Sequence, residues 1–391
     1  MAPPDPPAAR LGRYEVTSTG GESVRAFVPP ALPPDPPIAM DGLYTALEAA
    51  NRALGRLDGA TSILPDTPLF LYMYVRKEAL LSSQIEGTQS SLADLLLFES
   101  DEAPGVPLDD VQEVSNYVAA MTTGLERLRG GFPLSARLIR EIHEVLLAGA
   151  RGGTKQPGEF RRSQNWVGGT RPGNAAYVPP PPHLVPDLMA DLERFIHEVP
   201  PRLPLLVRAA LVHVQFETIH PFLDGNGRLG RLLVTFLLCA EGALREPVLY
   251  LSLFLKRHRA AYYDHLQAVR QRGAWEPWLS FFLEGVRETS DQAADAARQL
   301  IALFERDRRR IEALGRPAGS ALRVHQHLQS KPLVSVPAVS AALGLSAPTV
   351  RKSIGHLVEL GIVREQTARQ RGRLFIYQDY LDLLAQGTEP L

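Results

Sequence analysis

Cysteine is almost absent from this chain of 391 residues: Cys239 is the only one, so no disulfide can form within the chain. We therefore expect a reducing compartment. Long apolar runs are also missing, since a stretch such as Leu232–Ala240 has only about half the length that crosses a bilayer. The N-terminal sequence MAPPDPPAAR lacks the apolar centre of a secretory signal. These absences predict a cytoplasmic protein without a membrane partner.

A strong charge of either sign is missing as well. The chain has 42 Lys and Arg against 43 Asp and Glu, a net charge of −1. This balance excludes a polybasic nucleic-acid binder of the histone kind, but it leaves room for one basic patch. Hydrophobic residues make up 45% and charged residues 22%, which is typical of a globular protein that, at this length, has two or three domains. Arg outnumbers Lys, and Ala, Pro and Leu are abundant, which favours a bacterial origin.

Apolar periodicity predicts a mainly helical chain with an irregular start. Residues 1–40 are rich in proline, and one short strand is expected within residues 13–29. After that, apolar residues at three- and four-residue spacing predict successive helices. These helices cover residues 43–57, 70–87, 108–128, 134–150, 183–198, 203–219, 228–241, 256–271 and 275–314.

The segment 151–182 interrupts the helical pattern with a high density of Gly and Pro. Two runs of β-type residues, FRRSQNWV and AAYVP, flank the stretch Gly168–Asn174. The arrangement predicts an exposed β-hairpin inserted into a helical protein.

The last part of the chain, residues 318–391, has more Lys and Arg than Asp and Glu, unlike the chain as a whole. Its pattern predicts one helix, then two helices joined by a tight turn at Gly344, then two short strands around a basic turn. This is the outline of a winged helix-turn-helix, whose second helix would begin near Ser346. We expect Arg351, Lys352, Arg371 and Arg373 to be its DNA contacts, while a role in binding protein instead of DNA stays open.

A short segment with the sequence IHPFLDGNGRLGR, residues 219–231, concentrates groups that bind phosphate. Pro221 ends the preceding apolar helix, and Gly225 and Gly227 allow a turn in which successive N–H groups point inward. A new helix begins at once, and its N-terminus favours an anion.

Charged side chains complete this segment. Arg228 and Arg231 are three residues apart, so they share one helix face and can both reach the anion. Asp224 offers the hard oxygen that Mg²⁺ prefers, and His220 can accept a proton near neutral pH. The spacing therefore predicts a base, a metal ligand, an anion cradle and two cationic clamps.

This segment, HPFLDGNGRLGR, resembles the defining motif of Fic-domain proteins, HPFx[D/E]GNGxxxR, at every fixed position. The stretches PGEFRRSQNWVGG, PVLYLSLFLKRHRAAYYDHLQ and WEPWLSFFLEG also resemble the family, so the similarity covers roughly residues 30–290. It implies a mainly α fold: a Fic-type helical core with a β-hairpin flap, followed by the winged helix. The resulting division is an N-terminal arm and helical region (1–105), a Fic domain (106–290), a helical linker (291–317) and a winged helix domain (318–391).

The resemblance implies a protein adenylyltransferase that transfers AMP from ATP to a Ser, Thr or Tyr hydroxyl of a protein, itself included. His220 would be the base and Asp224 the ligand of Mg²⁺. Gly225, Asn226, Gly227, Arg228, Leu229, Gly230 and Arg231 would bind the phosphates, with Arg231 on the γ-phosphate. The flap residues Val167, Gly168 and Gly169 and the aromatic pair Tyr262 and Tyr263 would also line the ATP site, and the flap would align the target protein by strand addition.

A second motif of the family is present in residues 82–87, SSQIEG, which resembles the inhibitory pattern [S/T]xxxE[G/N]. Ser82 and Glu86 are four residues apart and so share one helix face, and Gly87 ends the helix. The resemblance implies that Glu86 pairs with Arg231 and denies the γ-phosphate its clamp.

Other classes of protein have less support. The chain contains no P-loop and no kinase motif, and in His143–Glu144 the start of a zinc-protease helix is followed by Leu147 where the second His must stand. Two alternatives stay open: a DNA-binding regulator whose Fic domain senses a ligand, and a de-AMPylase in which Glu86 orients water. Many relatives form homodimers, so a homodimer is expected by analogy. The protein target cannot be named.

Overall fold

A computed structural model describes residues 10–19, 21–62, 67–99, 106–149, 153–198, 203–366 and 372–390 of the chain. Helices dominate this part, accompanied by a two-stranded and a three-stranded sheet, which confirms the mainly α fold. Among the described residues, no helix has the length and apolarity to cross a membrane.

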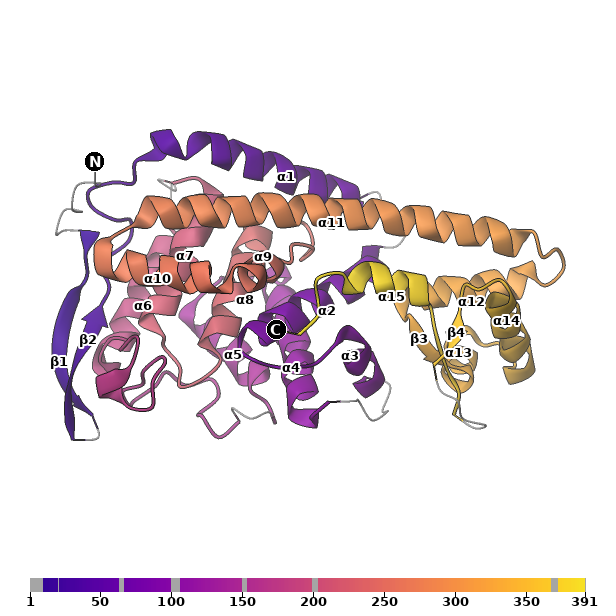
Figure 1. Cartoon of the computed structure of the whole chain (residues 1–391), viewed down its shortest axis with the longest axis horizontal. Helices are drawn as coiled ribbons and strands as arrows, with labels where there is room; N and C mark the ends of the chain where they lie inside the picture. The colour runs from indigo at the N-terminus through magenta and orange to yellow at the C-terminus, as the bar shows by residue number, and fades with distance from the viewer. Residues whose placement is uncertain are drawn as a thin grey trace.

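The helical body contains eleven helices in the described part of the chain. Their bounds are α1 (Tyr44–Ser62), α2 (Thr67–Ile85), α3 (Leu92–Phe98), α4 (Leu108–Arg129), α5 (Ala136–Leu146), α6 (Val185–Ile196), α7 (Leu205–Ile219), α8 (Asn226–Ala240), α9 (Ser252–Arg257), α10 (Arg259–Arg272) and α11 (Trp275–Glu312). The pair α7 and α8 packs together at the centre of the body. The long α11 lies beside α1 along one side of the molecule, and α11 also packs on α7 (Figure 1). Every residue from Leu206 to Ile219 is buried, as expected for a central helix that is apolar all round.

The N-terminal region differs from the single strand that the sequence predicts. It forms an antiparallel hairpin of β1 (Arg13–Thr19) and β2 (Glu22–Val28), with Arg13 opposite Val28. The second strand also carries the flap, because Phe27 N donates to Val178 O at 2.9 Å. Figure 1 shows this hairpin at one end of the molecule.

The flap is a looser hairpin than the two strands that the sequence predicts. Only Val167 and Tyr177 form an antiparallel bridge in it, through hydrogen bonds of 2.8 and 3.1 Å. Residues 179–182 are four consecutive prolines, which have no N–H to extend the ladder.

Two other local predictions need correction. The predicted helix 256–271 is two helices, α9 and α10, because the backbone at His258 leaves the helical region with φ of −108° and ψ of 34°. The short helix α3 has no counterpart among the predicted helices, although it has a capping box in which Ser91 accepts from Asp94 N and the Asp94 side chain accepts from Ser91 N.

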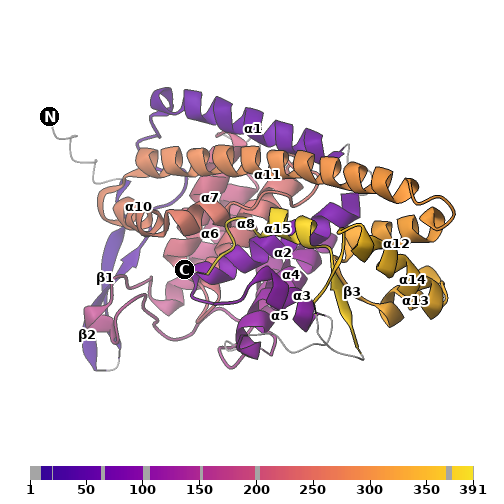
Figure 2. The ribbon, with the colours of Figure 1, turned by 45° about the vertical axis from the view of Figure 1, so that its right-hand side comes forward.

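The predicted winged helix is present at the end of the molecule opposite the β1–β2 hairpin (Figures 1 and 2). Gly344, with φ of 63°, ends its second helix as predicted. A further helix after the wing, α15, was not predicted. The bounds are α12 (Ala318–Ser330), β3 (Leu333–Ser335), α13 (Val336–Leu343), α14 (Ala347–Glu359), β4 (Arg364–Glu365), β5 (Leu374–Ile376) and α15 (Gln378–Ala385), with the strands in the order β3-β5-β4.

The winged helix is joined to the body through α11, which runs without a break across the predicted boundary between residues 290 and 291. Near its end, the buried Asp307 accepts a hydrogen bond from Tyr377 Oη at 2.7 Å and pairs with Arg306. The chain after α15 then returns to the centre of the body beside α2, as Figures 1 and 2 both show. The two ends of this domain are therefore both attached to the body.

Candidate active site

His220 lies at the end of α7 in an unusual backbone conformation. Its φ of 50° and ψ of 59° are left-handed, which is uncommon for a residue other than glycine. Its N–H still donates to Phe216 O at 2.9 Å, so the turn is closed in the way that helices often end. This turn sets the direction in which the imidazole leaves the helix.

The loop after His220 is fixed from its inside. Asn226 is buried, and its side chain accepts from Phe222 N and donates to Phe222 O, both at 2.9 Å. Phe222 is itself buried and stacks on His143, with 3.7 Å between the ring centroids. The amide of Asn226 therefore closes the loop instead of facing a ligand, and any contact with phosphate would come from its backbone N–H.

His143 supports the same loop through both of its ring nitrogens. Its Nε2 lies 3.0 Å from Asp224 O, and Gly158 N donates to its Nδ1 at 2.9 Å. Burial lowers the pKa of His143 to about 4, so the ring is neutral at neutral pH. No group of three or more His, Cys, Asp or Glu that could hold a metal ion occurs in the described part of the chain.

Asp224 is the carboxylate at the mouth of the loop, and it fits a magnesium ion. Its side chain is partly exposed, and its contacts with Gly225 N (2.6 Å) and Arg228 Nη2 (3.6 Å) both use Oδ1. Mg²⁺ usually takes one or two carboxylates from the protein and completes its shell with phosphate oxygens and water. A single half-exposed carboxylate beside a helix N-terminus suits that arrangement.

The two arginines of α8 are buried and have separate partners. Arg228 Nη1 donates to Glu113 Oε2 of α4 at 3.0 Å. Arg231 donates through Nε to Ser82 Oγ at 2.8 Å, and through Nη2 to Ser82 O at 3.0 Å and to Glu86 Oε1 at 2.7 Å. The structure thus brings the predicted inhibitory motif and the predicted γ-phosphate clamp together.

Glu86 lies directly over the start of α8. A Cβ atom added to Gly227 would be 2.2 Å from Glu86 Oε1, so only glycine allows the carboxylate this close to the loop. Burial raises the pKa of Glu86, but the charge and the hydrogen bond of Arg231 lower it by more. The pKa of Glu86 therefore lies below its ordinary value. Glu86 is therefore ionised at neutral pH, in the place where an anion would meet the helix. Gly87 follows it with φ of 106°, as the predicted end of α2 requires.

The C-terminal segment holds the same turn of α2 from behind. The buried Gln84 donates through Nε2 to Ser90 O at 2.9 Å and to Thr388 O at 2.8 Å. Lys256 Nζ donates to Gln84 Oε1 at 2.7 Å and also to Glu389 O. The turn that carries Glu86 is thus tied to residues that follow the winged helix.

The remaining predicted nucleotide contacts have different environments. Leu229 is buried in the core, and at Gly230 a Cβ would be 2.5 Å from Glu217 Oε1, so these residues serve the packing of α7 on α8. Tyr262 is also buried, with its hydroxyl 2.8 Å from His213 Nε2, whereas Tyr263 is exposed. The flap residues are Val167, half-buried, and Gly168 and Gly169, both exposed.

The predicted DNA contacts also separate. Arg351 and Lys352 are exposed on α14. Arg373 is paired with Glu365 across the wing, through Nε to Oε1 at 2.6 Å and through Nη2 to Oε2. Arg371 lies outside the described residues.

Sequence reasoning missed two side chains that shape the site, Glu113 and Arg161, and it did not predict that Arg270 lies near His220. Glu113 holds Arg228, while the two arginines lie close enough to His220 to affect its charge. Burial and the positive charges of Arg270 and Arg161 lower the pKa of His220 to about 3, so its imidazole is neutral at neutral pH. Arg161 stands in the flap stretch FRRSQNWV, where two adjacent arginines gave no sign of which one is buried.

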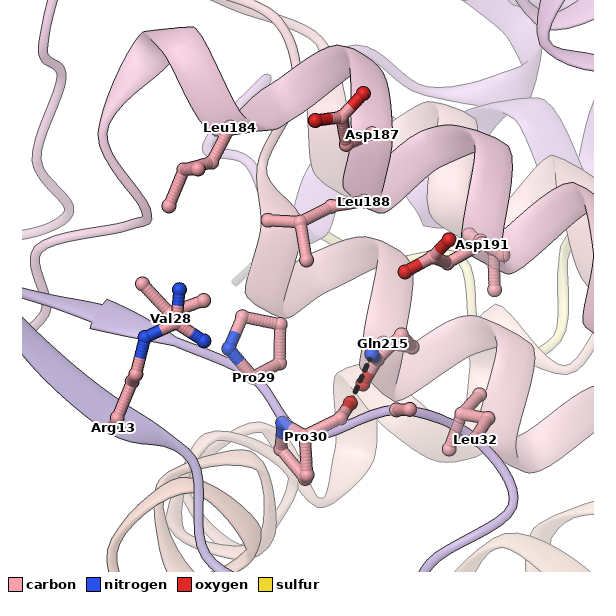
Figure 3. A pocket seen from close by; sticks show the side chains of 12 residues that line it. Arg13, Val28, Pro29, Pro30, Leu32, Leu184, Asp187, Leu188, Asp191 and Gln215 are labelled. Carbon is pink, nitrogen blue, oxygen red and sulfur yellow. Dashed lines mark hydrogen bonds between the residues drawn. The ribbon is translucent and has the colours of Figure 1, made fainter.

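A pocket of about 330 Å³ lies elsewhere, between the N-terminal arm and α6 (Figure 3). Asp187 and Asp191 line one side, Arg13 and Pro30 the other, and Gln215 Nε2 donates to Pro30 O at 2.8 Å. No residue of the loop 219–231 lines it, so it is separate from the candidate active site.

Comparison with known proteins gives three matches to family models. Residues 44–126 match the Fic/DOC family N-terminal region, residues 133–238 the Fic/DOC family, and residues 320–364 a winged helix-turn-helix DNA-binding family. The chain is thus similar to known families over its helical body and over its C-terminal part.

Two curated relatives are both named protein adenylyltransferase Fic. The one from Aedes aegypti is 34% identical over 245 residues, which cover 59% of this chain and 45% of the relative. The one from Drosophila willistoni is 28% identical over 302 residues, 75% of this chain and 54% of the relative. The chain therefore spans about half the length of these relatives. Among solved structures, a Fic family protein from Desulfovibrio desulfuricans G20 is 21% identical with a TM-score of 0.55, over 86% of this chain and 96% of that one, and it supports the fold alone.

Proposed function

We propose that this chain is an autoinhibited protein adenylyltransferase, since it matches the Fic/DOC family, the N-terminal region of that family and a winged helix family. It transfers AMP from ATP to a Ser, Thr or Tyr hydroxyl of a protein, its own chain included. The observation that carries the proposal is the position of His220, in a left-handed turn at the end of α7, directly before the loop that leads into the N-terminus of α8.

The transfer needs one proton acceptor and a site for anions. His220 takes the proton of the attacking hydroxyl of the target residue. The oxygen of that hydroxyl bonds to the α-phosphorus, and the bond from this phosphorus to pyrophosphate breaks. The first N–H groups of α8 have no partner within the helix and are available to phosphate oxygens. Mg²⁺, held by Asp224, would neutralise charge on the phosphates. Positioning and electrostatic stabilisation of this kind carry most of the catalysis in phosphoryl-type transfer.

Glu86 is the inhibitor in this proposal. The hydrogen bond from Arg231 Nη2 to Glu86 Oε1 uses the group that would otherwise hold the γ-phosphate. A carboxylate at this point also repels the phosphates of ATP. The serine in the motif stays useful after release, because Ser82 keeps Arg231 in place through Nε.

The test is incorporation of label from α-labelled ATP into the full chain, alone and with lysate. We expect low incorporation in wild type and an increase of about tenfold or more in Glu86→Gly, the factor that one charge-assisted hydrogen bond of about 1.5–3 kcal/mol represents. An absence of transfer in both proteins refutes the proposal, and a signal that is lower in Glu86→Gly favours a use of Glu86 in removing AMP.

Glu241→Gly is a matched control. Glu241 also follows a helix, its side chain is 40% exposed, and it pairs with the buried Arg208 at 3.0 Å, much as Glu86 is 36% exposed and pairs with Arg231. It lies at the far end of α8 from the loop. Glu241→Gly should therefore leave incorporation at the wild-type level.

The winged helix supports a second function, binding of DNA. The match to a DNA-binding family and the exposed Arg351 and Lys352 on α14 favour it. If α14 meets phosphates, affinity for duplex DNA should fall steeply with salt, and Arg351→Ala should reduce the slope of log affinity against log salt by about one. An absence of binding at low salt would refute the DNA contact and leave the domain a role in docking or regulation.

A further inference from the structure

The C-terminal end of α7 raises a question of hydrogen bonding. The last carbonyl groups of a helix have no partner within it, and a buried end needs donors from elsewhere. Tyr177 Oη donates to Thr218 O at 2.6 Å, and Arg270 Nη2 donates to Glu217 O at 3.2 Å. Arg270 also stacks on the Tyr177 ring, with its Cζ 3.9 Å from the centroid.

Arg161 supplies the donors for the final residues. Its Nε donates to His220 O at 2.9 Å, and its Nη2 donates to Ile219 O at 3.4 Å. Its backbone N donates to Pro221 O at 2.9 Å. One flap residue therefore binds three consecutive carbonyl groups around the left-handed turn at His220.

The same guanidinium ties this turn to the flap. Arg161 Nη2 donates to Pro180 O at 2.5 Å, and Nη1 donates to Ser163 O at 3.4 Å. The side chain is almost completely buried, and burial lowers the pKa of Arg161 to about 10. Burying a charged group costs free energy, and the hydrogen bonds to carbonyl groups must offset this cost. A residue with fewer donors would leave some of these buried carbonyl groups without a hydrogen bond.

We propose that Arg161 is a positioning residue for nucleotidyl transfer: its planar guanidinium holds the left-handed turn that places the His220 imidazole. This inference depends on the proposed role of His220 as the base. Arg161 itself is not placed on the reacting atoms, because its side-chain hydrogen bonds all go to backbone carbonyls of the turn and of the flap. A lysine can keep the charge but cannot reproduce the fork that binds several carbonyls at once.

The charge of Arg161 has a separate effect from its shape. Three charged side chains from three elements act on His220: Arg161 of the flap, Arg270 of α10 and Glu86 of α2. The backbone of Glu217 in α7 also bonds to the ring. The arginines lower the pKa of His220, and Glu86 raises it. Lysine and methionine at position 161 therefore separate the two effects, since lysine removes the fork and methionine removes the charge as well.

The test uses the full chain with Glu86→Gly as parent, so that the clamp is free. Arg161→Lys should lower kcat by about 10- to 100-fold, since a shift of about 1 Å in a reacting group can cost 10²-fold, while KM for ATP changes by less than about twofold. Arg162→Lys is the matched control, because Arg162 is the next residue and is exposed; it should keep the kcat of the parent. Equal kcat in the two lysine variants overturns the proposal.

Two measurements by NMR do not depend on activity. The ¹³Cα shift of His220, which reports a left-handed backbone, should change in Arg161→Lys and stay unchanged in Arg162→Lys. The pKa of His220 should rise in Arg161→Met toward the ordinary value of about 6.5, which moves the acid limit of kcat to higher pH, because only the neutral ring accepts a proton. If the parent transfers no AMP, the proposed function is wrong, and an unchanged ¹³Cα shift in Arg161→Lys then refutes the positioning role by itself.

Discussion

Two Glu–Arg pairs lie one helical turn apart on α8, and they differ in access to water. In the first, Arg228 meets Glu113 at 3.0 Å, and the Glu113 side chain is 9% exposed. In the second, Arg231 meets Glu86 at 2.7 Å, and the Glu86 side chain is 36% exposed. Both arginines are buried, so the exposure of the acidic partner is what distinguishes access to water in the two pairs.

The difference separates a structural pair from a removable one. Separating Glu113 from Arg228 would leave two buried charges no longer paired with each other, which costs much free energy. Withdrawing Glu86 moves a carboxylate from a half-open site into water, while Arg231 keeps its bonds to the Ser82 side chain and backbone. An inhibitory contact must be reversible, and only the pair with the exposed acid has this property.

The largest expected effect is the loss of His220, because it removes the proposed base whichever arginine is free. In the Glu86→Gly parent, His220→Ala should lower transfer by about 10²- to 10⁴-fold, the usual contribution of a general base. Binding of ATP should persist, because α8 and both arginines remain. His183→Ala, at an exposed histidine on the surface, is the control and should be as active as the parent. Full activity of His220→Ala would remove His220 from the mechanism.

Stability should distinguish the two pairs next. Glu113→Gln leaves Arg228 buried without its carboxylate, and breaking a buried pair by removing one partner costs about 3–5 kcal/mol. Glu86→Gln should cost clearly less, since water reaches that side chain. The check is the midpoint of urea unfolding for the two variants beside wild type. Equal shifts would mean that exposure does not separate the pairs.

Activity should also distinguish the two pairs, but here the change at Glu86 should have the larger effect. Glu86→Gly should raise incorporation by about tenfold or more, whereas Glu113→Gln should not raise it, because Arg228 is not the group that Glu86 occupies. Adding Arg231→Ala to Glu86→Gly should return incorporation to the floor, since the clamp itself is then gone. An increase in Glu113→Gln of the same size would show that either arginine can serve as the clamp.

The sequence predicts one of these pairs and not the other, for a physical reason. Ser82, Glu86 and Arg231 belong to two motifs of fixed spacing, and their resemblance to the family implies the contact. Glu113 belongs to no motif. The sequence around an acidic residue on a helix is the same whether its side chain is buried or exposed. Its role depends on how α4 packs against α8, which spacing within one helix does not contain.

Other features escaped prediction in the same way. The apolar residues of β1, Tyr14 and Val16, alternate with polar ones but are exposed, so their alternation does not mark a buried face. The break at His258 has no Gly or Pro to mark it. Arg161 and Arg162 are identical neighbours, and only the folded flap shows which one is buried. Local patterns therefore predict helices and the loop, while long-range burial decides which side chains support them.

The smallest expected effect concerns the last turn of α2, which carries Glu86. It comes from a change in the C-terminal segment that binds this turn. The Glu86–Arg231 pair depends on the last turn of α2, and Thr388 O accepts a hydrogen bond from Gln84 in that turn. Gly387 precedes Thr388 with φ of 78°, and a Cβ there would lie 2.8 Å from Leu253 Cδ1 and 3.1 Å from Arg257 Nη2. Valine at this position would therefore strain the backbone and push the segment off α9.

Gly387→Val should loosen the turn of α2 and weaken the Glu86–Arg231 pair, the proposed inhibitory contact, without touching the loop 219–231. We expect a rise in incorporation of a few-fold, since displacing one neutral hydrogen bond is worth about 0.5–1.5 kcal/mol, and faster amide hydrogen exchange in residues 82–86. Gly372→Val is the matched control, because Gly372 has a φ of 68° in the same domain and no described atom lies within 4 Å of its added Cβ. The exposed pair responds to the C-terminal segment only if Gly387→Val differs from Gly372→Val in both measurements, and the buried Glu113–Arg228 pair should be indifferent to either change.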